Sequence, residues 1–211
     1  MLPRRHGHGD DLEGKLSAVE RFYAERARPA RFQITPAAQP SALELALLAR
    51  GYLRGAPTAV QTRELMMPTV SPAAVTGVEI SGRPTTLWWE VWQAALGVAP
   101  ARAAAVSDLF DRVLVPAGFV VAFLDDRPAA VALGVVDGGW LGIFNMATLP
   151  AQRRRGAGNA ALAALADWGG TRAATTAYLQ VDLDNQPARR LYRDAGFTDA
   201  YQYVYLSRAK R

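Results

Sequence analysis

The run RRRGAG (residues 153–158) stands between a strand-like stretch that ends with ATLP (147–150) and an alanine-rich stretch. This pattern predicts a turn over 153–158 and a helix over 159–168. The first turn of a helix has unpaired N–H groups and partial positive charge, worth ~0.3–1 kcal/mol to a bound anion. Glycines allow positive φ and close approach of an anion to the backbone, and arginines pair with phosphate oxygens through two nitrogens. The segment therefore predicts a binding site for a phosphorylated ligand.

Other phosphate-binding motifs fit this segment less well. A Walker loop requires Gly-Lys-Ser/Thr, and no such sequence follows the arginines. A dinucleotide fingerprint requires a third small residue and an acid about 20 residues later. Ala161 satisfies the first requirement, but Asp182 comes late and follows a different order of strands. The pattern that remains is Arg-x-x-Gly-x-Gly.

The amino-acid composition excludes several kinds of binding and catalytic site. The chain has 211 residues, half of them apolar, and a formal net charge of +5, which suits an anionic ligand. It has no cysteine, which excludes disulfides, thiolate zinc sites and cysteine nucleophiles. Its two histidines, His6 and His8, lie near the N-terminus, so we expect neither a metal site nor histidine catalysis. The arginine run lacks the interleaved aromatic residues of a nucleic-acid surface, so we expect no nucleic-acid partner.

The sequence also shows no stretch typical of a membrane span or a signal peptide. No apolar run approaches the ~20 residues that span a membrane, so no membrane partner is predicted. The stretch MLPRRHGHGDD lacks the apolar segment of a signal peptide. We therefore expect a cytoplasmic protein.

The elements that must position the turn follow a clear order. From residue 75 the pattern predicts β-α-α-β-β-β-α-β-α-β, a mixed sheet with helices on its faces. Hairpin turns are expected at DDRP (125–128) and at DGG (137–139), in which Asp137-Gly138 is a strong hairpin signal. Trp88, Trp89 and Trp92 share one helical face, which predicts core packing or one wall of a substrate cleft. The predicted segments are strands at 75–81, within 118–148 and at 177–183, helices at 84–97, 100–115, 159–168 and 187–196, and a final hairpin or strand at 197–207.

An internal repeat relates the first part of the chain to the last. The predicted helix 11–27, strand 31–35, helix 41–51 and strand 58–65 repeat part of the later order. Matched residues keep nearly constant offsets: Gln33 with Gln180 and Pro40 with Pro187 at 147, and Gly51-Tyr52 with Gly196-Phe197 at 145. The repeat predicts a duplication in which the first copy is a fragment of the second.

Two linked blocks then identify a family resemblance. The first is the Arg-x-x-Gly-x-Gly turn, and the second is the segment NQPARRLYRDAGF (185–197) after the next strand. Together, over residues 75–207, they strongly resemble the GNAT superfamily of acyl-coenzyme A-dependent N-acetyltransferases. The resemblance implies an α/β GNAT fold whose two central parallel strands, GIFNMAT (142–148) and AYLQVDL (177–183), splay apart.

The resemblance also implies a co-substrate, acetyl-coenzyme A, bound between the splayed strands. The pantetheine arm would pair with backbone groups of 146–148 as an added strand does. The turn at 153–158 would hold the pyrophosphate, and Tyr192 would lie beside the sulfur. The implied cofactor-binding residues are Met146, Ala147, Thr148, Arg153, Arg154, Arg155, Gly156, Ala157, Gly158, Asn159, Asn185, Ala188 and Tyr192.

The implied chemistry is direct attack of a neutral primary amine on the thioester carbonyl. The catalytic groups would be a backbone N–H of Met146 or Ala147 for the oxyanion and the Tyr192 hydroxyl for the leaving thiolate. Many family members carry a glutamate on the strand before the turn, whereas this strand reads Phe-Asn-Met (144–146). Asp182, Asp184, Glu90 or an ordered water would then accept the amine proton. The missing acid leaves a second hypothesis open, a non-catalytic module that senses acyl-coenzyme A or binds a protein.

The resemblance implies that the first part of the chain is a degenerate, partial copy of a GNAT domain. We predict such a copy at 1–67, a linker at 68–74 and the acetyltransferase domain at 75–208. Ala38 stands where the second copy has Asn185, and Leu45 or Leu47 stands where it has Tyr192. The fragment lacks strands that should precede it, so its sheet edges would pair with the other half or with a second subunit in a homodimer.

Overall fold

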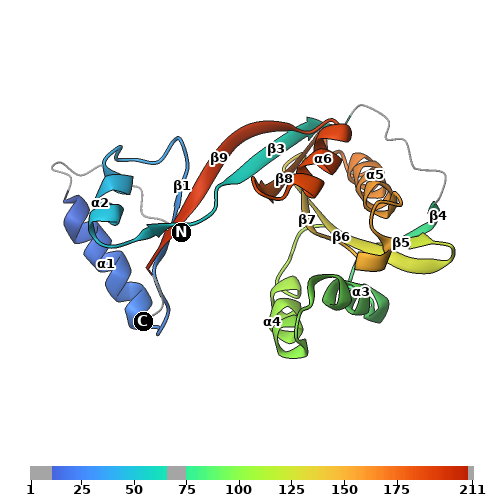
Figure 1. The fold of residues 1–211 in the computed structure, drawn as a ribbon, viewed down its shortest axis with the longest axis horizontal. Coiled ribbons are helices and arrows are strands. Elements are labelled where there is room, and N and C mark those ends of the chain that lie inside the picture. Colours follow the sequence, from blue (N-terminus) through green and yellow to red (C-terminus); the bar gives the residue numbers. More distant parts are fainter. Residues whose placement is uncertain (1–10, 66–74, 209–211) are drawn as a thin grey trace. The chain divides into compact units, whose positions relative to one another are not determined.

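The computed structural model describes residues 11–65 and 75–208 (Figure 1). The order of elements from residue 75 is the predicted one, with one short 3-10 helix added. The linker expected at 68–74 and the two histidines lie outside the described residues. The elements are α1 (Leu12–Ala24), β1 (Arg31–Ile34), α2 (Leu43–Ala49), β2 (Leu53–Arg54), β3 (Thr58–Glu64), β4 (Val75–Ser81), α3 (Thr86–Leu96), α4 (Pro100–Phe110), β5 (Ala117–Leu124), β6 (Arg127–Asp137), β7 (Trp140–Thr148), η1 (Pro150–Gln152), α5 (Ala157–Gly170), β8 (Thr176–Asp182), α6 (Gln186–Asp194) and β9 (Thr198–Ser207).

The strands follow the order β1-β9-β3-β8-β7-β6-β5-β4, and β2 also pairs with β9. Neighbours from β4 to β7 are antiparallel, whereas β7 and β8 are parallel. This is the mixed α/β architecture that the sequence predicts. The last segment, predicted as a hairpin or a strand, is the single strand β9.

The described residues form two compact units. The first contains residues up to 59, 182–184 and those from 201 onward; the second contains 60–181 and 185–200. In the first unit, β1 and β2 both pair with the end of β9. In the second, β3 stands between β8 and β9 in the strand order. The predicted boundary between 1–67 and 75–208 stays a prediction, because the linker lies outside the described residues.

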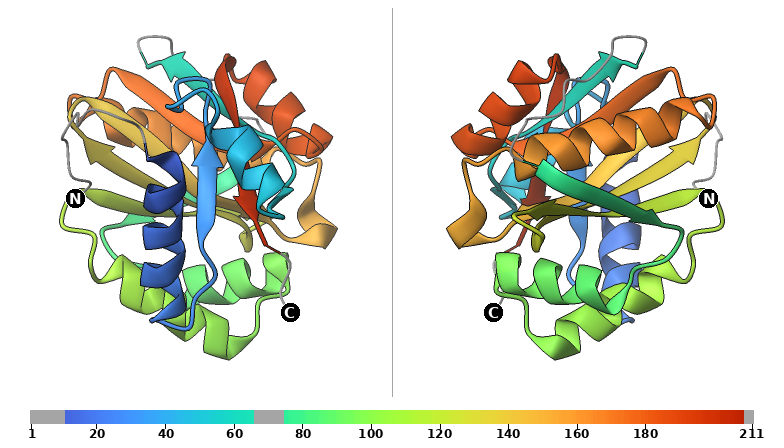
Figure 2. Two further views of the ribbon diagram at one scale, coloured as in Figure 1. Left: turned by 90° about the vertical axis from the view of Figure 1, so that its left-hand side faces the viewer. Right: turned by 90° about the vertical axis from the view of Figure 1, so that its right-hand side faces the viewer.

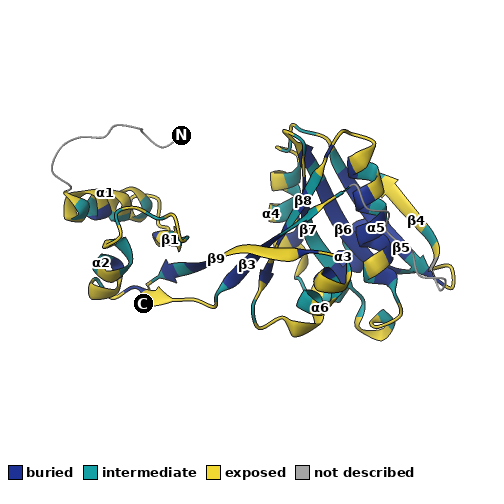
Figure 3. Ribbon diagram, turned by 90° about the horizontal axis from the view of Figure 1, so that it is seen from above, coloured by how far each residue is buried: buried dark blue, intermediate teal, exposed yellow. Residues whose placement is uncertain are grey.

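In the second unit, α5 covers one face of the sheet and α3 and α4 cover the other (Figure 2). Glycines allow α5 to lie close to the strands: a Cβ on Gly118 would lie 2.8 Å from the Trp168 ring, and one on Gly134 would lie 2.7 Å from Leu165. Most residues of β5 and β6, part of β7 and the inner side of α5 are accordingly buried, whereas β4 is mostly exposed (Figure 3).

The opposite face holds an aromatic cluster. Trp88 is 0% exposed and Trp92 is 4% exposed, and both pack with Phe119 of β5 and Val131 of β6. Trp89 is half-buried against the same cluster. The core-packing alternative for these tryptophans is therefore confirmed for Trp88 and Trp92.

The glycine turn between β6 and β7 lies where the sequence predicts it. The hairpin between β6 and β7 turns at Gly138 and Gly139, with φ of 54° and 81°, while Asp137 pairs with Trp140. The turn lies within the predicted DGG segment, and both of its central positions have positive φ, which glycine adopts most readily.

Candidate active site

The two central parallel strands separate along their length. β7 and β8 are in register from Trp140 and Thr176 to Ile143 and Leu179, and no pairing between them continues beyond. The part of β7 after Ile143 therefore lacks a β-ladder partner on its β8 side among the described residues. Strand edges of this kind accept an extended ligand through backbone hydrogen bonds.

A β-bulge interrupts β7 where the strands have separated. Val131 pairs with Ala147 and Leu133 pairs with Phe144, so two residues of β7, 145 and 146, stand opposite one residue of β6. Asn145 has the left-handed φ of 51°. A bulge leaves one residue outside the regular ladder, and here that residue is one of the two at positions 145 and 146.

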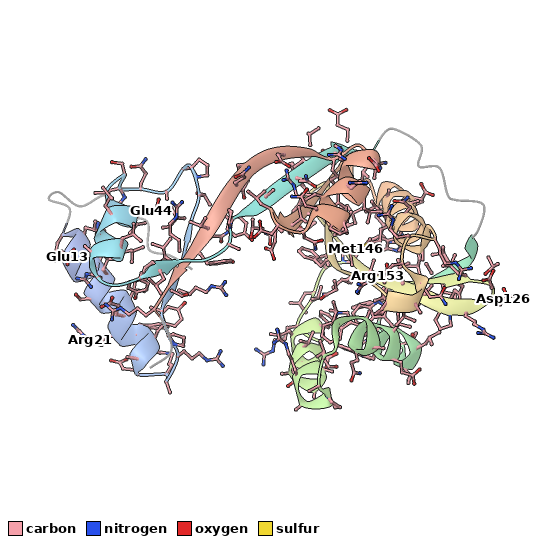
Figure 4. All side chains as sticks on the ribbon, in the orientation of Figure 1. Glu13, Arg21, Glu44, Asp126, Met146 and Arg153 are labelled. Atoms are coloured by element: carbon pink, nitrogen blue, oxygen red, sulfur yellow. The ribbon has the colours of Figure 1, made fainter. Side chains whose placement is uncertain are left out.

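The turn after β7 leads into an uncapped helix. α5 begins at Ala157, and its N-cap, Gly156, has a φ of 93° and makes no side-chain cap hydrogen bond. No side chain therefore satisfies the N–H groups of the first turn, which are free to bind an anion. Figure 4 shows Met146 on β7 and Arg153 in this turn.

The predicted boundary between turn and helix is wrong by two residues. Ala157 and Gly158 belong to the first helical turn, and positive φ occurs at Gly156 and at Arg154 (65°). Gly158 therefore does not serve to adopt positive φ, because Gly156 already reverses the chain. A Cβ on Gly158 would lie 3.6 Å from Thr148 Oγ1 and 3.5 Å from Leu191 Cδ2. The start of α5, the end of β7 and α6 thus meet at this point.

The three arginines of the turn differ in their partners, although all are exposed. Arg155 donates to Asp125 and to Gln152, each at 2.6 Å. Arg153 makes a long contact of 3.5 Å to the Thr148 carbonyl oxygen, and Arg154 has no side-chain partner among the described residues. Arg154 is therefore the arginine of this run that a ligand phosphate can engage without displacing another contact.

Asn185 caps α6 from the end of the β8–α6 connection. Its side-chain oxygen accepts the Ala188 N–H at 3.2 Å, so the carboxamide nitrogen is the group that remains to contact a ligand. Asn185 is exposed and Ala188 is half-buried. Asn159, in the first turn of α5, is also exposed.

Tyr192 lies on the buried side of α6. It is 6% exposed, and its ring contacts Phe197 edge-on with 6.1 Å between centroids. Burial raises the pKa of its hydroxyl to about 12. The hydroxyl is therefore protonated at neutral pH and remains a hydrogen-bond donor. It makes no hydrogen bond to the described residues.

The three carboxylates expected as possible proton acceptors differ in their surroundings. Glu90 and Asp184 are exposed, and Asp182 accepts a hydrogen bond from the Thr58 hydroxyl at 3.0 Å. Among residues 11–65 and 75–208, no group of three or more His, Asp or Glu side chains is placed to hold a metal ion. No helix of that part of the chain is long and apolar enough to cross a membrane.

Two features of the site were not predicted from the sequence. One is the bulge, for which Asn145 inside a strand-like run was the available signal, because Asn adopts positive φ more readily than most residues. The other is the ion pair of Arg155 with Asp125, which joins residues 30 positions apart. No short stretch of sequence indicates a contact between residues so far apart.

A family model described as "Probable histone acetyltransferase Rv0428c C-terminal" matches residues 9–206. Among curated proteins, the "Uncharacterized N-acetyltransferase YobR" of Bacillus subtilis (strain 168) is 27% identical over 192 residues, which cover 89% of this chain and 76% of that protein.

Solved structures share the fold. A GCN5-related N-acetyltransferase from Sphaerobacter thermophilus matches with a TM-score of 0.71 at 20% identity, over 95% of this chain and 69% of that chain. A tandem GNAT protein from the clavulanic acid biosynthesis pathway matches with a TM-score of 0.72 at 15% identity, over 95% and 70%. A GCN5-related N-acetyltransferase from Kribbella flavida matches with a TM-score of 0.65 at 19% identity, over 95% and 76%.

Proposed function

Because this chain belongs to the family described as "Probable histone acetyltransferase Rv0428c C-terminal" and is a GNAT-type acetyltransferase, we propose that it transfers an acetyl group from acetyl-coenzyme A to a primary amine. The amine attacks the thioester directly in a ternary complex. The acceptor is an amine of a small molecule, a peptide N-terminus or a lysine side chain. The family description names a histone acetyltransferase, which is compatible with the last of these.

One observation carries this proposal: the separated end of β7, its bulge and the uncapped start of α5 lie in succession. The pantetheine arm would extend along the backbone of Met146–Thr148, where β7 has no ladder partner on its β8 side. The pyrophosphate would then lie at the start of α5. Its partners would be the turn residues Arg153–Gly158 together with Asn159, with Asn185 and Ala188 contacting the cofactor from α6.

The bulge and Tyr192 would stabilise the two atoms that gain negative charge in the reaction, the carbonyl oxygen and the leaving sulfur. As the amine nitrogen bonds to the carbonyl carbon, negative charge moves to the carbonyl oxygen, which the N–H of Met146 or Ala147 would stabilise. The C–S bond then breaks and coenzyme A leaves as a thiolate. Tyr192 would donate a hydrogen bond to the sulfur.

The raised pKa defines the kind of help that Tyr192 gives. A phenol with a pKa of about 12 is a weaker acid than a thiol with a pKa of about 8.5, so complete proton transfer to the thiolate is uphill by about 5 kcal/mol. Hydrogen bonding to the thiolate, without transfer, is the role that fits. The amine proton would leave through an ordered water, because β7 carries no acid at its bulge, where residues 144–146 are Phe-Asn-Met.

We also propose that the first part of the chain is a degenerate copy of the second. The order α1-β1-α2 followed by β2 and β3 repeats the order α5-β8-α6-β9. In the first unit β9 stands between β1 and β2, and in the second β3 stands between β8 and β9, so each copy receives one strand from the other. Gly51 after α2 and Gly196 after α6 both have positive φ, 81° and 87°.

The hydrogen bonds after these two helices support one alignment of the copies. The N–H of Tyr52 donates to the carbonyl oxygen of Leu47 at 3.1 Å, and the N–H of Phe197 donates to that of Tyr192 at 2.9 Å. These equivalent bonds align Leu47, and not Leu45, with Tyr192. The first copy thus has a buried side chain without a hydroxyl at this position.

The first copy also lacks the other elements of the site. α2 begins after Ala42, which makes no side-chain cap hydrogen bond, whereas α6 begins after Asn185, which does. β1 lies at the end of the strand order with β9 as its one neighbour among the described strands. It therefore forms no pair of separating parallel strands, and we propose that acetyl-coenzyme A binds the second copy.

The alternative is a module that binds acyl-coenzyme A without catalysis, and the absence of an acid on β7 favours it. Thiol release from acetyl-coenzyme A separates the two functions, and a chain without cysteine adds no thiol of its own. We expect release that depends on an added amine, with intersecting double-reciprocal lines. Parallel lines would contradict direct attack. Stabilisation by acetyl-coenzyme A without release, across amines, peptide N-termini and lysine peptides, would favour the sensor.

A further inference from the structure

Two backbone hydrogen bonds end α6 beside Tyr192. The N–H of Phe197 donates to the carbonyl oxygen of Tyr192 at 2.9 Å, and the N–H of Gly196 donates to that of Arg193 at 2.9 Å. This pair of bonds, with a φ of 87° at Gly196, is a Schellman motif. The first and last residues of such a motif often pack together, as the rings of Tyr192 and Phe197 do. The orientation of Tyr192 therefore depends on the turn at 195–197.

Arg63, the next-to-last residue of β3, lies against this turn. Its Nη1 donates to the carbonyl oxygen of Ala195 at 2.7 Å, and its Cδ would lie 3.6 Å from a Cβ on Gly196. Its guanidinium carbon is 5.9 Å from the centroid of the Phe197 ring. A cation at this end of a helix is stabilised by the partial negative charge of the last carbonyl groups. Arg63 thus attaches β3 to the turn that follows Tyr192.

A second set of contacts attaches β3 to α6 on the same side of Tyr192. Gln61 is 3% exposed, and its Nε2 donates to Asp199 Oδ1 at 2.6 Å. The other oxygen of Asp199 accepts from Arg189 Nη2 of α6 at 3.0 Å. Arg189 precedes Tyr192 by three residues, which is about one helical turn. β3 therefore contacts α6 and its end both before and after Tyr192 in the chain.

The first unit has an arginine in the corresponding position. Arg208 follows Arg63 by 145 residues, which is also the offset between the two helix-ending Gly-aromatic pairs of the repeat. Its guanidinium carbon lies 4.8 Å from the centroid of the Tyr52 ring. Arg63 and Arg208 thus each lie beside the aromatic residue that follows a helix-ending glycine.

An acid accompanies each of these arginines. Glu20 of α1 accepts from Arg208 at 3.0 Å, and Asp167 of α5 stands 147 residues after Glu20, which is the offset of the earlier part of the repeat. Burial lowers the pKa of the Arg63 guanidinium, and the charge of Asp167 partly offsets this effect. The two arginines differ in one contact, because Arg208 donates to no helix-end carbonyl among the described residues. Arg208 is therefore a matched control for that hydrogen bond.

We propose that Arg63 is a positioning residue, supplied by the first copy, that holds the end of α6 and so orients the Tyr192 hydroxyl toward the leaving sulfur. The catalytic part of this inference rests on the proposed function. Its structural part, that Arg63 holds the turn at 195–197, stands on the contacts alone. The degenerate copy then contributes a side chain, in addition to a strand, to the reaction of the second copy.

The test compares R63M with R208M. Both replace a guanidinium beside an aromatic ring by an apolar side chain, and only R63M removes a hydrogen bond to a helix-end carbonyl. We expect exchange of the Gly196 and Phe197 N–H groups, measured by NMR without cofactor, to be about tenfold faster in R63M than in R208M. We expect kcat to fall about tenfold in R63M and less than twofold in R208M, with affinity for acetyl-coenzyme A within threefold of wild type in both.

A double-mutant cycle with Y192F separates positioning of the hydroxyl from a general loss of structure. If Arg63 acts through the Tyr192 hydroxyl, R63M should lower kcat less than about twofold in the Y192F background. An equal fall in the two backgrounds would overturn the catalytic part. Equal exchange at Gly196 and Phe197 in R63M and R208M would overturn the structural part.

A wild-type protein that does not turn over acetyl-coenzyme A would contradict the proposed function and the catalytic part with it, while the exchange comparison still decides the structural part. If R63M does not fold, the wild-type protein gives the decision. The Nη protons of Arg63 should then exchange with water at least about tenfold more slowly than those of Arg154, which has no side-chain partner among the described residues. Equal rates at the two arginines would overturn the inference.

Discussion

Replacing Tyr192 by phenylalanine removes one oxygen from the proposed leaving-group site and little else. The hydroxyl makes no hydrogen bond to the described residues, and the ring contact with Phe197 remains. We therefore expect the free energy of unfolding at pH 7 to change by less than about 1 kcal/mol. The substitution separates a catalytic contribution from a structural one.

The expected loss of turnover follows from the hydrogen bond to sulfur. A hydrogen bond to a charged group contributes about 1.5–3 kcal/mol, which corresponds to about a ten- to 150-fold lower kcat. Because the bond forms as negative charge develops on the leaving group, affinity for acetyl-coenzyme A should stay within about threefold of the wild-type value. The raised pKa of Tyr192 means that its ionisation should not alter kcat below about pH 11.

The assay is steady-state thiol release at saturating acceptor, with acetyl-coenzyme A affinity measured separately by calorimetry. Phe197→Leu is a control that changes the ring beside Tyr192 and keeps the hydroxyl. An unchanged kcat in Y192F would refute the assignment of Tyr192 to the leaving group. A loss of affinity equal to the loss of kcat would refute a role confined to the transition state.

Four further outcomes are expected. Arg154→Gln should weaken coenzyme A binding in calorimetry more than Arg155→Gln, because Asp125 and Gln152 already engage Arg155, and should leave a phosphate-free pantetheine analogue unaffected; equal losses in both variants would contradict a free Arg154. Gly156→Ala should destabilise the fold by about 1–2 kcal/mol in urea titrations, because φ is 93° there, and an unchanged midpoint would contradict this strain. A chain of residues 75–211 lacks β3 and should show less folded structure by circular dichroism than one of residues 58–211; equal spectra would contradict a structural need for β3. Burial raises the pKa of Tyr192 from 10.0 to about 12, so ionisation of its hydroxyl disfavours the folded state. Relative to Y192F, the free energy of unfolding of the wild type should be unaffected below pH 10 and should fall by about 2–3 kcal/mol as pH rises toward 12. Parallel plots of this free energy against pH for the two proteins would contradict this.

The order of helices and strands was predictable because its signals are local. Apolar alternation, glycines after helices and the two sequence blocks each lie within about a dozen residues. The turn–helix boundary was displaced because RRRGAG contains two glycines and only one, Gly156, adopts positive φ. Sequence alone does not distinguish which glycine reverses the chain.

The contacts that were not predicted join distant positions. The hydrogen bond from Trp88 to Ala132 spans 44 residues and depends on how α3 packs on the sheet. The insertion of β3 between β8 and β9 depends on strand order, although the repeat did indicate that the first part of the chain needs partners for its edges. Such pairings depend on tertiary packing, which residue type does not encode locally.

In the proposed function, acetyl-coenzyme A binds along β7 with its pyrophosphate at the start of α5. The most direct test is an amide NMR titration of the labelled wild-type protein with acetyl-coenzyme A. We expect the largest shifts at Met146–Thr148 and at Gly156–Asn159. Saturable shifts confined to other residues, or no shifts at millimolar acetyl-coenzyme A, would contradict it.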